Sequence, residues 1–159
     1  MTFTIRPFAE SDRGACRSIL AALPEWFGIE EVNDGYVAAL TPTNGRVVFD
    51  GNQEVIAFLG LTDHGDASWE IEVMGVLPDR HHIGIGRRLV DEAIRTVEAA
   101  GGRWLHVKTR GPATYDEPYE RTRRFYRAVG FDPLYESLTE WGPEDAALIL
   151  LMRVGDHAA

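Results

Sequence analysis

The chain has 159 residues, of which 45% are hydrophobic and 26% are charged, a composition typical of a globular protein. Its net charge of −9 argues against nucleic-acid binding, which needs a basic surface, and no apolar run approaches the roughly 18 residues of a membrane span. The segment MTFTIRPFAESD lacks the basic and apolar regions of a signal peptide, and the one cysteine, Cys16, has no partner for an internal disulfide. We therefore expect one cytoplasmic domain over residues 1–159, with neither nucleic acid nor a membrane as its partner.

The first half of the chain carries strand and helix patterns in alternation. Four strands are expected, at residues 2–8, 46–50, 54–62 and 69–77. Two helices come between the first two strands. The first is capped by Ser11 or Asp12, ends at Pro24 and has an apolar face of Ala15, Cys16, Ile19, Leu20 and Leu23. The second helix covers residues 29–40, and turns at Gly51-Asn52 and Gly65-Asp66 join the later strands.

The second half is expected to hold two helices and three strands. A helix over residues 84–100 presents one apolar face, formed by Leu89, Val90, Ala93, Ile94 and Val97, and stops at Gly101-Gly102. A strand at 103–109, a loop at 111–118 and a helix at 120–129 follow, and the last two strands cover 131–138 and 146–154. Strands and helices thus alternate along the chain, which predicts an α/β architecture.

The segment IEVMGVLPDRHHIGIGRRLV, residues 71–90, predicts an anion site. An apolar strand ends at Pro78-Asp79, and a turn leads into a helix that opens with Gly84-Ile85-Gly86. Unpaired N–H groups at a helix N-terminus converge there, and glycine lets a diphosphate approach the backbone. The nucleotide pattern G-x-x-x-x-G-K-[ST] is absent, and the dinucleotide pattern G-x-G-x-x-G lacks its third glycine. A different pyrophosphate-bearing cofactor is therefore expected.

This segment resembles motif A of the GNAT acetyltransferases, whose turn reads [Q/R]-x-x-G-x-[G/A]. The turn here is His81-His82-Ile83-Gly84-Ile85-Gly86, with His81 where the family usually has Gln or Arg. The order of the expected elements is also the GNAT order over nearly the whole chain. The resemblance implies a mixed sheet of about seven strands, about four helices, and acetyl-CoA as co-substrate. The implied contacts to acetyl-CoA come mainly from backbone amides, at Met74, Gly75, Val76, His81, His82, Ile83, Gly84, Ile85, Gly86 and Arg87.

A second segment, TRRFYRAVGF at residues 122–131, resembles motif B of the same family, which places a Tyr four residues before a Gly-Phe pair. The resemblance implies that Tyr126 protonates the departing thiolate of coenzyme A. Seven residues earlier, Tyr119 stands where the family often has an Asn that touches the pantetheine arm. The alternative interpretation of Tyr126 is a core tyrosine with a satisfied hydroxyl.

Two carboxylates, Glu70 and Glu72, lie on the strand that precedes the glycine turn, and strand alternation puts them on one face with Met74. Alkyl amines, with a pKa of about 10, are protonated at neutral pH, so a carboxylate near the acceptor can serve as general base. The family often has its base at the position of Glu70. The alternative for either glutamate is an ion pair or a solvated sheet edge.

Other chemistries find little support in the sequence. Cys16 lies on the apolar face of the first helix, where an inert core thiol is usual. His81 and His82 are adjacent, while His64, His106 and His157 are scattered without the spacing of metal ligands, so no metal site is expected.

The resemblance places the acceptor between the first two helices and the last hairpin, near residues 24–28 and 139–145. Both segments carry a Trp and acidic residues, which suit a cationic amine with an apolar portion. The alternative is that the aromatic residues cover the core and the acidic residues only keep the surface soluble. The sequence predicts an N-acetyltransferase that moves an acetyl group from acetyl-CoA to a small amine by direct attack in a ternary complex. A non-catalytic acyl-CoA-binding module, a protein or peptide N-acetyltransferase, and association as a homodimer stay open.

Overall fold

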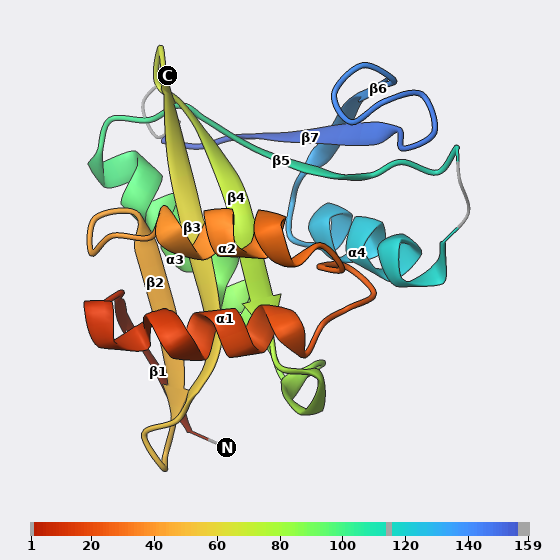
Figure 1. Cartoon of the computed structure of the whole chain (residues 1–159). Helices are drawn as coiled ribbons and strands as arrows, with labels where there is room; N and C mark the ends of the chain where they lie inside the picture. Colours follow the sequence, from red (N-terminus) through yellow and green to blue (C-terminus); the bar gives the residue numbers. More distant parts are fainter. Residues whose placement is uncertain (1, 114–115, 156–159) are drawn as a thin grey trace. The chain divides into compact units, whose positions relative to one another are not determined.

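The computed structural model describes residues 2–113 and 116–155 (Figure 1). The strands are β1 (Phe3–Pro7), β2 (Gly45–Asp50), β3 (Val55–Gly65), β4 (Ser68–Val76), β5 (Trp104–Arg110), β6 (Asp132–Ser137) and β7 (Ala147–Arg153). The α-helices are α1 (Arg13–Ala21), α2 (Glu30–Ala38), α3 (Ile85–Ala99) and α4 (Glu117–Ala128), with short 3-10 turns η1 (Glu10–Asp12) and η2 (Pro78–Arg80). Within the described part of the chain, no helix is both long and apolar enough to cross a membrane.

The seven strands form a mixed sheet, as the sequence predicted. Hydrogen-bonded neighbours follow the order β1-β2-β3-β4-β5-β7-β6. β4 and β5 pair in parallel, whereas β1–β2, β2–β3, β5–β7 and β6–β7 are antiparallel. The parallel pairing of β4 with β5 runs from Ser68↔Trp104 to Ile71↔Val107. In the described chain, Met74 and Val76 therefore lie farther along β4 than the last residue that pairs with β5.

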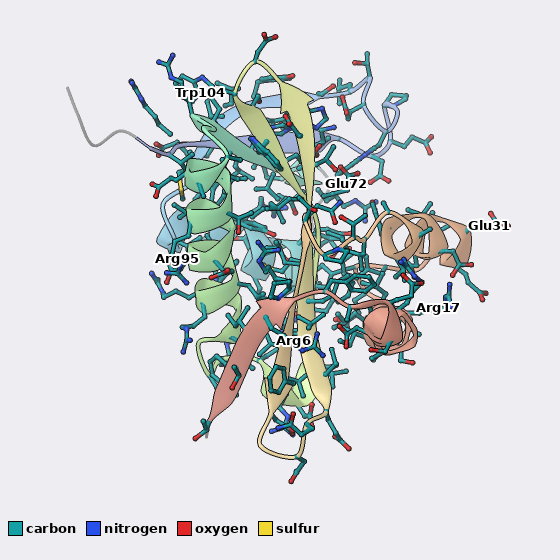
Figure 2. All side chains as sticks on the ribbon, turned by 90° about the vertical axis from the view of Figure 1, so that its left-hand side faces the viewer. Arg6, Arg17, Glu31, Glu72, Arg95 and Trp104 are labelled. Carbon is teal, nitrogen blue, oxygen red and sulfur yellow. The ribbon has the colours of Figure 1, made fainter. Side chains whose placement is uncertain are left out.

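The chain forms two compact units. The first comprises Met1–Thr62 and Glu72–Ala93, and the second comprises Asp63–Ile71 and Ile94–Ala159. In the first unit, α1 and α2 lie side by side on one face of the strands, and the start of α3 lies on the opposite face (Figure 1). The same arrangement is seen from the side in Figure 2, where the labelled Arg17 and Glu31 project from α1 and α2 away from the strands.

An apolar core fills the first unit beneath α1 and α2. Its buried members include Phe8, Cys16, Ile19, Leu20, Leu23, Val37, Val47, Phe58 and Val73. The predicted apolar face of α1 is therefore confirmed at four positions, while Ala15 is only half-buried. Burial also raises the pKa of the Cys16 thiol to about 12, which leaves it protonated and unreactive at neutral pH.

In the second unit, α4 packs on β5 and β6, and its side chain Tyr126 is buried. Other buried residues here are Leu105, Val107, Phe131, Leu148 and Leu150. Leu105 and Val107 come from β5, whose buried and half-buried residues alternate, whereas Leu148 and Leu150 belong to the continuous apolar run of β7. β6 forms the edge of the sheet, and most of its residues are exposed.

Two local expectations were wrong in detail, and one turn contains an element that was not predicted. α4 begins at Glu117, three residues before the predicted start, because Pro118 fits the first turn of a helix; the expected loop at 111–118 is shorter, and residues 114–115 lie outside the described part. The turn after β4 contains η2, which the sequence analysis did not predict. Finally, Asp12 precedes α1 but makes no capping bond there, since its carboxylate instead accepts hydrogen bonds from Arg6 and from the Ala9 N–H.

Candidate active site

The turn between β4 and α3 is held in place by contacts within the first unit. Leu77 N–H donates to the Ile56 carbonyl at 3.0 Å. In η2, Arg80 donates to the buried carboxylate of Asp50 at 3.1 Å, and Asp50 also accepts backbone N–H groups of its own hairpin. The β2–β3 hairpin thus anchors the turn that leads to the glycine segment.

The N-terminus of α3 presents backbone donors to solvent. The first helical hydrogen bond runs from Arg88 N–H to the Gly84 carbonyl at 3.1 Å, so the N–H groups just before Arg88 have no carbonyl one turn earlier in the helix. Gly84 has φ +90°, and a Cβ built on it would meet nothing within 4 Å. His82 also has a left-handed backbone, with φ 63°. An open, positively polarised helix start of this kind fits a diphosphate.

The predicted contact residues of this turn differ in what they offer. Ile85 is 1% exposed and packs in the core, so only its backbone can meet a ligand, whereas Ile83 is exposed. The Arg88 guanidinium lies 5.1 Å from the centre of the Phe3 ring. Arg87 is exposed at the helix start. Backbone amides are donors that this turn supplies whatever its side chains do.

The end of β4 carries the predicted contact residues Met74, Gly75 and Val76. A Cβ on Gly75 would lie 3.1 Å from Ile19 Cγ2 of α1, so glycine permits the close packing of α1 on this strand. His81 donates from Nε2 to the Val76 carbonyl at 2.8 Å, which ties the turn back to β4. One lone pair of the Val76 carbonyl is thus already used within the protein, and the side chain of His81 helps to shape the turn.

Glu70 lies in the second unit at the centre of a cluster of polar side chains. It is 4% exposed, and its Oε2 atom is 2.7 Å from His64 Nε2 and 3.6 Å from His106 Nε2. Its Oε1 atom is 3.5 Å from Lys108 Nζ, and Lys108 also bonds to Glu140 at 2.5 Å. Burial opposes ionisation of Glu70, but the nearby imidazole of His106, the hydrogen bond from His64 and the charge of Lys108 lower its pKa to about 2.

We define the Glu70 cluster as His64, Glu70, His106, Lys108 and Glu140. Donor atoms of its two histidines and of Glu70 lie within 4.8 Å of one another, a set that zinc can accept. However, ligands bound at about 2.0–2.1 Å in a tetrahedral site lie roughly 3.3 Å apart, and the 2.7 Å between His64 and Glu70 is a hydrogen-bond distance. The Lys108 ammonium already supplies a cation to the carboxylate. The geometry is that of a hydrogen-bonded cluster.

Sequence reasoning found Glu70 but missed its partners. His64 and His106 were dismissed as scattered, yet β5 pairs with β4 so that His106 is the direct partner of Glu70, and the β3–β4 hairpin returns His64 to the same carboxylate. The signal was present in the alternation of β5, where His106 and Lys108 fall on one face. Glu72, by contrast, is exposed and accepts a hydrogen bond from Thr62, which matches the solvated alternative considered for it.

Tyr126 is 6% exposed and lies against two aromatic rings, with ring centres 5.2 Å from Phe125 and 5.5 Å from Phe131. Burial raises the pKa of its hydroxyl above the ordinary value. The hydroxyl therefore keeps its proton at neutral pH, so it can donate a hydrogen bond but cannot serve as a base.

A hollow of about 480 Å³ lies at the loop between β6 and β7 in the second unit. Its lining is Arg110, Trp141, Gly142, Pro143, Glu144 and Asp145. Arg110 Nε is 2.8 Å from Asp145, and its side chain also reaches Asp116 at 3.3 Å. This hollow contains most of the second segment that the sequence analysis assigned to the acceptor.

Two solved structures that share this fold are described as putative acetyltransferases. A putative acetyltransferase of the GNAT family from Desulfovibrio desulfuricans has a TM-score of 0.76 and 22% identity, with 96% of this chain and 99% of that chain covered. A putative acetyltransferase from Salmonella typhimurium, solved with its cofactor acetyl-CoA, has a TM-score of 0.73 and 15% identity over 100% of this chain and 98% of that chain. At these identities the likeness establishes the fold.

Sequence comparison establishes the family. A family model described as an acetyltransferase (GNAT) domain matches residues 43–133. The mycothiol acetyltransferase of Nocardiopsis dassonvillei is 30% identical over 107 residues, which are 67% of this chain and 29% of that protein. The chain belongs to the GNAT acetyltransferase family, and it matches less than a third of the length of this curated relative.

The ionised state of Glu70 predicts how acid affects stability. Because its folded pKa of about 2 lies below the ordinary value of 4.5, its contribution is complete above about pH 4.5 and is lost as the pH falls toward 2. We expect Glu70→Gln to lower the free energy of unfolding by about 1–3 kcal/mol at pH 7, with a smaller difference near pH 3. Urea unfolding at both pH values measures it. Glu72→Gln, two residues along the same strand, is the control and should change little; equal effects of the two variants would contradict a special environment for Glu70.

Proposed function

We propose that this protein is an acetyl-CoA-dependent N-acetyltransferase that transfers the acetyl group to a primary amine by direct attack in a ternary complex. The observation that carries the proposal is the open N-terminus of α3, with its left-handed Gly84, in a chain of the GNAT family. The backbone amides around Gly84 and Gly86 hold the diphosphate of coenzyme A. Acetyl-CoA supplies the activated acetyl group as a thioester.

Two side chains serve the transfer in this proposal. Tyr126 keeps its proton at neutral pH and donates it to the departing thiolate, with placement rather than acidity as its contribution, since burial raises its pKa. Glu70 serves the removal of the proton from the attacking amine, because it is ionised within a cluster that contains two imidazoles. No acyl-enzyme is formed, because Cys16 is buried with a raised pKa.

A small cationic amine is the acceptor that the surface charge favours. The hollow beside Trp141 carries the carboxylates of Glu144 and Asp145, and the whole chain has a net charge of −9. An ammonium group is attracted by such a field and can lie over an indole ring. A screen for acetyl-CoA-dependent thiol release with polyamines, amino acids, aminoglycosides and peptides tests the function. Turnover with a small amine supports the proposal, whereas binding of acetyl-CoA without turnover of any amine would favour a non-catalytic module.

The diphosphate assignment predicts the effect of filling the glycine turn. Gly86→Val should weaken coenzyme A binding at least about tenfold, since a branched side chain keeps the diphosphate from the backbone. Calorimetry of the folded variant measures the affinity. Gly14→Val is a matched control: Gly14 and Gly86 are each the second residue of their helix, and a Cβ on Gly14 would meet nothing within 4 Å. Equal affinity of the two variants would contradict the assignment.

The role of Tyr126 predicts a separation between binding and turnover. Tyr126→Phe keeps the ring and its contacts with Phe125 and Phe131 but removes the hydroxyl. We expect coenzyme A affinity to change little and kcat to fall by about 10- to 10³-fold. Steady-state kinetics combined with calorimetry checks both values. A variant that unfolds at a lower temperature but turns over normally would show that the hydroxyl is a structural donor.

A further inference from the structure

The state of Glu70 raises the question of which atom receives the proton of the amine. Its pKa of about 2 makes it a weak base at neutral pH. Its oxygens are also engaged, with Oε2 facing His64 and His106 and Oε1 facing Lys108. A buried carboxylate in this condition is better suited to orient a neighbouring group than to accept a proton itself.

His64 is the neighbour whose geometry fits that role. An ionised carboxylate only accepts hydrogen bonds, so the 2.7 Å contact requires that His64 Nε2 carry the hydrogen. The neutral imidazole then has its lone pair on Nδ1. A carboxylate that fixes the tautomer of a histidine in this way is the arrangement that makes histidine a general base in hydrolase triads. Histidine is also the side chain whose reference pKa, about 6.5, is closest to neutral.

Exposure distinguishes His64 from the second histidine of the cluster. The His64 side chain is 44% exposed, whereas the His106 side chain is 17% exposed and lies farther from the carboxylate, at 3.6 Å. An acceptor that arrives from solvent can therefore reach His64 more readily.

The charged groups around His64 come from its own hairpin and from two further segments. On its own strand, Asp63 accepts the Gly65 N–H. Glu70 on β4 and His106 on β5 contact His64 directly. Lys108 on β5 contacts the same Glu70 carboxylate and pairs with Glu140 in the loop after β6. The two glutamates of the cluster carry two negative charges against the one positive charge of Lys108, so the field favours a cationic acceptor.

We propose that His64, held by Glu70, is the general base of the transfer and that Glu70 is its positioning residue. This inference rests on the proposed function. His64 Nδ1 takes a proton from the amine nitrogen, whose lone pair forms the bond to the thioester carbon. When the carbon–sulfur bond breaks, the thiolate receives a proton from Tyr126. An initial ammonium group loses two protons. The first is released to solvent before the attack, and the second is taken by His64. His64 then gives up its proton and Tyr126 regains one through solvent, so the products are the amide, coenzyme A and one free proton.

The kinetic test compares two histidines of the same cluster. His64→Gln keeps an N–H that can donate to Glu70 but has no basic nitrogen, and we expect kcat/KM at pH 7 to fall by about 10²-fold. His106→Gln is the matched control, with an expected loss under about tenfold. The pH profile of kcat/KM should change in shape in His64→Gln, whereas the profile of His106→Gln should follow that of the wild-type protein. The loss should shrink near pH 10, where the amine is already neutral.

The outcomes separate this inference from the proposed function. If the wild-type protein acetylates none of the screened amines, the proposed function fails and this inference falls with it. If the wild-type protein is active and His64→Gln keeps both its rate and its pH profile, only the role of His64 is overturned.

A spectroscopic readout tests the positioning role of Glu70 without an acceptor. Nitrogen-15 NMR of the imidazole side chains in the wild-type protein at alkaline pH should show His64 as the Nε2–H tautomer. In Glu70→Leu, which has no oxygen to accept this hydrogen bond, the single tautomer should be lost. A mixture of tautomers in the wild-type protein, or a tautomer that is unchanged in folded Glu70→Leu, would overturn the positioning role.

Discussion

The start of α3 is the constraint on which the rest of the account depends. A helix leaves its first N–H groups without partners, and this helix exposes them at a turn with a left-handed Gly84. Much of the first unit serves to hold that turn. Arg80 ties it to the buried Asp50, His81 ties it to Val76, and Gly75 lets α1 pack closely on the strand that leads into it. An anion site made of backbone needs this rigidity because the donors cannot adjust one by one.

In the Glu70 cluster, the groups around one buried carboxylate decide whether it is ionised. Burial alone would favour the neutral acid, but two imidazoles and the Lys108 ammonium overcome that cost and keep Glu70 ionised. Tyr126 is the opposite case, because burial without a compensating charge holds it in the protonated form. The two buried groups are therefore held in opposite states at neutral pH, Glu70 ionised and Tyr126 protonated.

The sequence predicted the elements well where the signal is local. Alternation and periodicity gave the seven strands and four helices, because each pattern reflects burial within a single segment. The glycine turn was predicted for the same reason, since its residues are contiguous. The start of α4 was misplaced because Pro118 was interpreted as part of a loop, although proline also fits the first turn of a helix.

The partners of Glu70 could not be predicted, because they depend on strand register. His106 lies beside Glu70 only because β4 and β5 pair in parallel with these two residues opposite each other. His64 reaches the same carboxylate because the hairpin between β3 and β4 folds it back onto β4. A shift of one residue in either strand would send these side chains to the other face. The role of Gly75 likewise depends on how closely α1 approaches the strand.

The most direct test of the account is to follow the backbone amides of the whole protein by NMR while coenzyme A is added. The account predicts that the amide signals of Gly84, Ile85 and Gly86 shift most, and that pantetheine, which lacks the diphosphate, binds much more weakly and leaves them nearly unchanged. Equal affinity for the two ligands, or shifts that leave these three amides unaffected, would contradict the claim that the start of α3 holds the diphosphate.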